Sequence, residues 1–114
     1  MGAEMSELRD KRIKFSVNIS NLVLWGNAHE GWEVVFGRDF DEANETLRHR
    51  KGSLHYVGLA NDLALYINGV YQEETEAYKE LGEMWKSYDP EDCWGGDFSK
   101  ADGNHFSVTY GGLK

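Results

Sequence analysis

The segment from Leu59 to Ile67 constrains the fold more than any other stretch of this chain of 114 residues. Its side chains alternate in character, so that Leu63 and Leu65 share one face of a strand while Asp62 lies on the other. An Asn-Gly pair, typical of a tight turn, follows directly. Because the apolar face must be buried against another layer, the sequence predicts an anchored strand that presents a carboxylate at a fixed position.

Helices are expected to cover the apolar face of this strand. Residues from about Lys11 to Asn27 are ambiguous, since positions 13 to 19 alternate like a strand whereas Phe15, Ile19 and Leu22 follow helical spacing. We favour a helix there. The segment from Ala77 to Tyr88 carries apolar side chains at three- and four-residue spacing, which predicts an amphipathic helix.

Shorter elements complete the expected fold. β-Branched and aromatic residues predict a strand over Trp32–Phe36, and alternation predicts a final strand over Phe106–Tyr110, with His105 at its start. A short surface helix is expected within Glu42–Leu47, capped by one of two preceding aspartates. The fold class is therefore α+β, a small antiparallel sheet backed by two or three helices.

Length and charge narrow the possible functions. The chain fits one domain over residues 1–114, with residues 1–10 as a flexible N-terminal extension and Met5 as the natural start. A formal net charge of -8 repels phosphate backbones and anionic lipids, so neither nucleic acid nor a membrane is an expected partner. Without an apolar run long enough to span a bilayer or to form a signal peptide, we expect a cytoplasmic product on synthesis, and a monomer.

Histidines and carboxylates form a candidate metal site. Cys93 is the only cysteine, which excludes an internal disulfide and a structural zinc site built on thiolates. His55, Asp62 and His105 match the three ligands that a hydrolytic zinc site typically uses, which leave one position for water. Asp62 and His105 are expected at strand ends, and His55 in the loop before the first of these strands.

Amide hydrolysis also needs a proton carrier. Asp102, three residues before His105 across a Gly-containing turn, is predicted to take a proton from water and to give one to the leaving amine, although Asp-Gly-Asn is also a plain turn sequence. Arg38 is a candidate to stabilise the oxyanion or to bind a substrate carboxylate, with a surface ion pair as the alternative. Ser53 is a candidate hydrogen-bond donor to the substrate or to a ligand, or a local backbone cap.

Two motifs carry a resemblance to a known family. The segment Ser53 to Asp62 matches S-x-H-x-x-G-x-A-x-D, and Asp102 to His105 matches D-x-x-H. With these motifs the chain is similar to the LAS-type zinc peptidases of the M15 family. Within that family it resembles the small phage endolysins, which are L-alanyl-D-glutamate endopeptidases. The resemblance extends from about Arg12 to Tyr110.

The resemblance implies a fold of the M15 type with bound Zn²⁺ and an acid/base. The zinc ligands that it implies are His55, Asp62 and His105. It implies that Asp102 is the acid/base, with aspartate in place of a more general glutamate as in the endolysin branch. It also aligns Arg38 with the transition-state arginine of the family, although this chain has Ala43 where the family often has glutamine.

The sequence thus predicts a zinc-dependent endopeptidase that cuts the stem peptide of bacterial peptidoglycan, and so an endolysin. Such an enzyme would be made in the host cytoplasm, act on the cell wall, and depend on a separate holin-like membrane protein for delivery. Two alternatives stay open. One is a D,D-carboxypeptidase or dipeptidase of the same superfamily, and the other is a non-catalytic wall-binding module of a phage structure.

Overall fold

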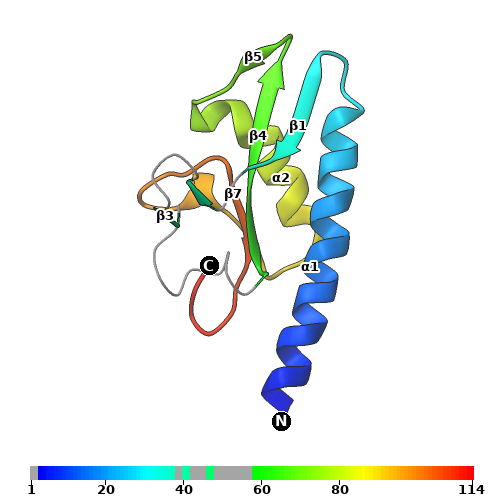
Figure 1. Ribbon diagram of the computed structural model, residues 1–114, viewed down its shortest axis with the longest axis vertical. Helices are drawn as coiled ribbons and strands as arrows, with labels where there is room; N and C mark the ends of the chain where they lie inside the picture. The colour runs from blue at the N-terminus through cyan, green and yellow to red at the C-terminus, as the bar shows by residue number, and fades with distance from the viewer. Residues whose placement is uncertain (1–2, 38–39, 42–45, 48–57) are drawn as a thin grey trace.

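The fold is α+β, as predicted, with two α-helices and a small antiparallel sheet (Figure 1). The structure is a computed structural model that describes residues 3–37, 40–41, 46–47 and 58–114. The helices are α1 (Ala3–Asn27), the 3-10 helix η2 (Thr75–Tyr78), α2 (Lys79–Tyr88) and the 3-10 helix η3 (Gly95–Asp97). The strands are β1 (Trp32–Phe36), β2 (Phe40–Asp41), β3 (Thr46–Leu47), β4 (Ala60–Ile67), β5 (Val70–Tyr71), β6 (Asp92–Trp94) and β7 (His105–Val108).

The central strand of the main sheet is β4, as its sequence alternation predicts. The strand order is β1-β4-β7-β6, and β5 pairs with the end of β4 through a turn in which Asn68 and Gly69 both have positive φ. One edge of β4 pairs with β1, and the other pairs with β7 so that Asp62 lies opposite His105. This register brings the two predicted ligands side by side, because directly opposed residues of an antiparallel pair project to the same face.

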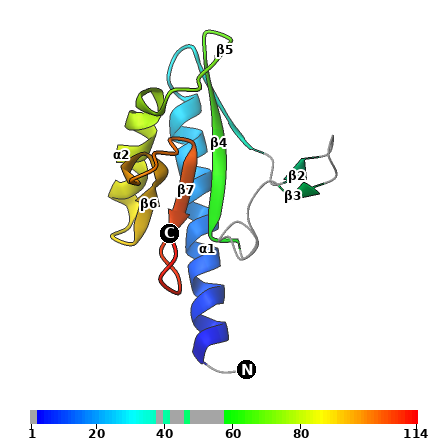
Figure 2. The ribbon, with the colours of Figure 1, turned by 90° about the vertical axis from the view of Figure 1, so that its left-hand side faces the viewer.

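The core lies between the helices and one face of the sheet. In Figure 2, α2 lies on one side of β4 and β7, and the pair β2–β3 lies on the other. Leu65 and Phe106 from the sheet, Phe15 from α1 and Trp85 from α2 are all buried, and the Phe15 and Trp85 rings meet edge to face at 5.5 Å. Asp62 and His105 alternate with these core residues along their strands, so they project from the face opposite to α2.

The ambiguous segment after Lys11 is helical, and the helix begins earlier than expected. Residues 3–10, predicted as an N-terminal extension, form the first turns of α1. The apparent strand alternation arises because α1 has apolar side chains on two opposite sides. Phe15 and Ile19 are buried in the core, whereas Ile13 and Val17 are both about half exposed. Neither α-helix of the described chain has the length and apolar composition that a bilayer span requires.

The short helix predicted within Glu42–Leu47 is wrong where the structure describes that range. Thr46–Leu47 is strand β3, which pairs in antiparallel fashion with β2, so that Phe40 lies opposite Leu47. Residues 42–45 lie outside the described residues. Strands β5 and β6 were not predicted, because two or three residues are too few to show an alternation. The final strand was predicted, but it covers 105–108 rather than 106–110.

Candidate metal centre

Asp62 and His105 form the centre of the candidate site. They lie opposite each other on β4 and β7, both more than nine-tenths buried, and Asp62 Oδ1 is 3.9 Å from His105 Nδ1. The other ring nitrogen, His105 Nε2, lies 3.0 Å from the Ser107 hydroxyl oxygen. The Phe98 ring packs against the imidazole at a centroid distance of 5.3 Å. Each ring nitrogen of the imidazole therefore has a polar neighbour, and Nδ1 faces the Asp62 carboxylate.

Asp102 reaches the same centre from the turn before β7. Its carboxylate, the Asp62 carboxylate and the His105 imidazole each offer one ligand atom, and these atoms all lie within 4.8 Å of one another. Asp62 and His105 are buried, whereas Asp102 is exposed. An imidazole and a carboxylate are donors of the kind that Zn²⁺ uses in hydrolytic sites, so Asp62 and His105 fit that ion, and Asp102 lies close enough to contact it or a molecule bound to it.

Backbone hydrogen bonds hold the turn that carries Asp102. The Asp102 N–H donates to the Gly95 carbonyl at 2.9 Å, and the His105 N–H donates to the Asp102 carbonyl at 3.1 Å. The Trp94 indole N–H donates to the Gly103 carbonyl at 2.7 Å. Each bond ties the turn to the sheet or to η3. The backbone from which the exposed carboxylate projects is thereby kept in a fixed position.

Two glycines leave room around these side chains. A Cβ on Gly37 would lie 3.1 Å from the Cβ of Asp62, and a Cβ on Gly95 would lie 2.8 Å from the Cβ of His105 and overlap the Asp102 carbonyl. The Gly37 N–H also donates to the Asp62 carbonyl at 2.6 Å, which extends the β1–β4 pairing to the site. The backbone thus packs directly against all three polar residues.

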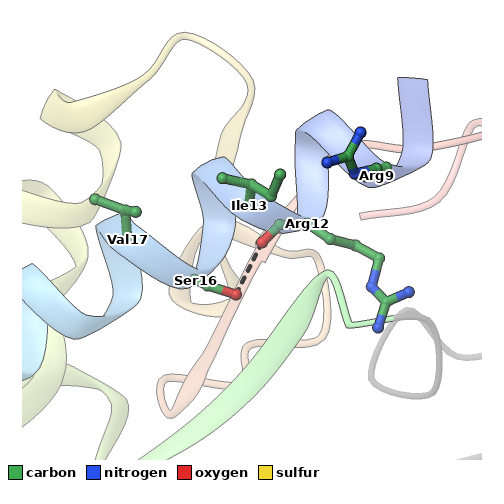
Figure 3. Close-up of a pocket in the computed structure, with 5 residues that line it drawn as sticks. All are labelled: Arg9, Arg12, Ile13, Ser16 and Val17. Carbon is green, nitrogen blue, oxygen red and sulfur yellow. Dashed lines mark hydrogen bonds between the residues drawn. The ribbon is translucent and has the colours of Figure 1, made fainter. Parts of the chain in front are cut away.

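Two of the hollows on the surface of the described chain differ in their chemical surroundings. One, of about 160 Å³, opens beside Asp102 and is lined mainly by polar atoms of the 71–75 and 101–104 segments. The other lies on the outer side of α1 (Figure 3), where the Ser16 hydroxyl donates to the Arg12 carbonyl at 2.8 Å. Its described lining is Arg9, Arg12, Ile13, Ser16 and Val17. This described lining contains neither a carboxylate nor an imidazole. The hollow beside Asp102 includes a carboxylate of the Asp62, Asp102 and His105 cluster, and it is therefore the candidate for substrate.

The comparison with protein-family models agrees with this geometry. A family model of the M15 peptidases, described as D-alanyl-D-alanine carboxypeptidase, matches residues 47–108. The chain belongs to the M15 peptidase family. The matched range contains β4, α2 and β7, and with them the whole cluster of Asp62, Asp102 and His105. No curated protein matches the chain.

The structure of this M15 peptidase brings together three of the six predicted site residues. Asp62, Asp102 and His105 converge within one small volume. The other three, Arg38, Ser53 and His55, lie outside the described residues.

Sequence reasoning gave Ser107 no role in the site of this M15 peptidase, yet its hydroxyl contacts the His105 ring. The sequence feature that could have identified Ser107 is its position two residues after His105, which places both side chains on the same face of the last strand.

Proposed function

We propose that this M15 domain is a zinc-dependent endopeptidase that hydrolyses the L-Ala–D-Glu bond in the stem peptide of bacterial peptidoglycan. The observation that carries the proposal is the convergence of Asp62, Asp102 and His105 in a chain of a wall-peptidase family. The choice of bond follows the resemblance of the two motifs to the endolysin branch. We also propose that residues 1–114 form a single catalytic domain.

In this proposal the buried side chains bind the metal and the exposed one moves protons. His55, Asp62 and His105 hold Zn²⁺, which when bound polarises the scissile carbonyl and acidifies a water. Asp102 accepts a proton from the attacking water and donates it to the leaving nitrogen as the C–N bond breaks, so that a carboxylate and an amine are formed. Arg38 is proposed to stabilise the oxyanion, and Ser53 to donate a hydrogen bond to the substrate.

The exposure of the two carboxylates supports this division of roles. A ligand benefits from burial, because exclusion of water strengthens its attraction to the metal. A general acid/base must instead reach the substrate. Asp62 is 7% exposed beneath the site, whereas Asp102 is exposed on a turn beside a polar hollow. Asp102 is therefore the better placed of the two to exchange a proton with substrate.

Digestion of purified sacculi tests the proposal. The zinc-loaded protein should release new amino groups from the sacculi, and removal of zinc with a chelator should abolish the release. D102N should lose at least about a hundredfold in rate while its zinc stoichiometry stays unchanged. D97N is the matched control, since Asp97 is an exposed aspartate that pairs with Lys86. Full activity without zinc, or a near-normal rate for D102N, would contradict the mechanism.

A second candidate function is D,D-carboxypeptidase activity, which the description of the matching family model favours. Mass spectrometry of digested stem peptides separates the two. An L-Ala–D-Glu endopeptidase leaves a product with a new N-terminal D-glutamate, whereas a D,D-carboxypeptidase releases free D-alanine. A non-catalytic wall-binding module would bind sacculi and release neither product.

The cellular setting is part of the same proposal. We propose that the protein is made in a host cytoplasm as a monomer. It acts on the wall after a separate holin-like protein has formed a pore in the membrane. The formal net charge of -8 gives no electrostatic attraction toward an anionic envelope. Expression with and without a pore-forming protein, followed by turbidity of the culture, tests this: lysis without the pore would contradict it.

A further inference from the structure

Among the described residues, the Ser107 hydroxyl lies next to the side of the His105 ring that faces away from Asp62. Its oxygen lies 3.0 Å from Nε2, while Nδ1 on the other side of the ring faces Asp62 Oδ1 at 3.9 Å. Ser107 is fully buried, so water does not compete for this contact. The serine hydroxyl is therefore positioned to accept a hydrogen bond when His105 carries its proton on Nε2.

The position of Ser107 is fixed by its backbone. It lies in the middle of β7, opposite Ala60 of β4 on one side and Cys93 of β6 on the other. Its carbonyl also accepts a hydrogen bond of 3.1 Å from the Trp85 indole N–H of α2. A residue held by two strands and a core tryptophan presents its side chain to His105 from a rigid base.

The chemistry of imidazole decides what this contact can do. A neutral imidazole carries one proton, so a ring that binds a metal through Nδ1 must carry its proton on Nε2. We propose that Ser107 is a positioning residue that accepts a hydrogen bond from His105 Nε2–H and so leaves the Nδ1 lone pair directed toward a metal beside Asp62. Metal-ligating histidines typically have such a partner on their second nitrogen. The inference deepens the proposed function, on whose metal site it rests.

Three variants of the full chain isolate the hydroxyl. S107A removes it with little change in volume, and S107T restores a hydroxyl in the same strand. T109A is the matched control, because the Thr109 hydroxyl lies 3.2 Å from Cys93 Sγ and away from His105. We expect S107A to bind zinc about 10- to 100-fold more weakly than wild type in competition with a chelator. S107T should recover most of this loss, and T109A should bind as wild type does.

A spectroscopic measurement reads the tautomer directly. In ¹⁵N spectra of the zinc-loaded wild type, with His105 assigned by comparison with H105Q, we expect a protonated Nε2 and a metal-bound Nδ1. Zinc on Nε2 would overturn the inference even if S107A fails to fold. Wild-type zinc affinity in S107A would overturn it while leaving the proposed function intact. A wild-type protein that binds no zinc would overturn both.

Discussion

Replacing Asp92 by asparagine should make the protein more stable at neutral pH. Asp92 begins β6 opposite Val108 and is 8% exposed, and in the described part of the chain neither of its carboxylate oxygens has a hydrogen-bond partner. Burial, assisted by the negative charge of Asp89, raises its pKa from 3.8 to about 7. Ionising this carboxyl in the folded protein is therefore costly, because nothing replaces the water that it has lost.

The sign and size of the effect follow from proton linkage. The folded protein holds the Asp92 proton up to about pH 7, whereas the unfolded chain releases it near pH 3.8, so stability falls as the pH rises between these values. Each unit of pKa shift corresponds to about 1.4 kcal/mol, which gives about 4 kcal/mol over the whole range. The unfolding free energy of D92N minus that of wild type should therefore increase by about 3 kcal/mol from pH 5 to pH 8.

Urea denaturation at pH 5, 6, 7 and 8, with a chelator present to remove any metal contribution, measures this difference. The control is D97N, which removes an exposed carboxylate that pairs with Lys86 and should change stability by less than about 1 kcal/mol at every pH. A difference between D92N and wild type that stays constant from pH 5 to pH 8 would show that the Asp92 carboxyl is not protonated in the folded protein.

Three further substitutions test packing and charge elsewhere in the domain. Y78F removes a buried hydroxyl with two hydrogen bonds, and it should lower the unfolding free energy measured with urea by about 1–3 kcal/mol. Burial raises the pKa of Tyr78 to about 12. Wild type, but not Y78F, should therefore lose additional stability as the pH rises above about 10. G95A forces a methyl group against the Asp102 carbonyl and should cost about 1–3 kcal/mol, measured as a lower melting temperature. The ion pair with Lys14 lowers the pKa of Asp89, so D89N should destabilise the protein at pH 7 and its effect should shrink as the pH falls below about 4.

The larger elements of this fold are predictable from sequence because each buries a long apolar face. The strand at Leu63 and Leu65 has a clear period of two, and both residues are fully buried in β4. The first helix is harder, since Ile13 and Val17 lie opposite its core face and imitate strand alternation. Periodicity alone leaves this choice open, because it does not show which apolar side chains find a partner.

The shorter elements depend on strand pairing, which their own few residues do not indicate. Strand β6 forms because Cys93 pairs with Ser107 of β7. The three residues of β6 show no local pattern that indicates a strand. Strand β3 replaces an expected helix because Thr46 and Leu47 pair with Asp41 and Phe40, which lie a few residues earlier in the chain. Helix propensity is a weak preference of a few tenths of a kcal/mol per residue, and strand pairing exceeds it easily.

In the candidate site, some residues are predictable from their side-chain chemistry, and others are identified only by their packing. The clustering of Asp62, Asp102 and His105 was predictable because their side chains have a known chemistry and because Asp62 and His105 lie on strands that the sequence alternation indicates. Ser107 was not, because a serine in a strand is ordinarily a neutral choice. Only the distance of 3.0 Å to the His105 ring distinguishes it from any other buried hydroxyl.

The two variable positions of the D-x-x-H motif are under different constraints in this chain. A Cβ on Gly103 would lie 2.7 Å from the Thr75 Cα, so any larger residue would push the turn away from η2 and carry Asp102 with it. At Asn104 the contact that matters is the carbonyl, which accepts the Leu63 N–H at 2.9 Å and which every amino acid provides. Position 103 therefore sets the place of Asp102 through its lack of a side chain, whereas position 104 anchors the turn to β4 whatever its side chain is.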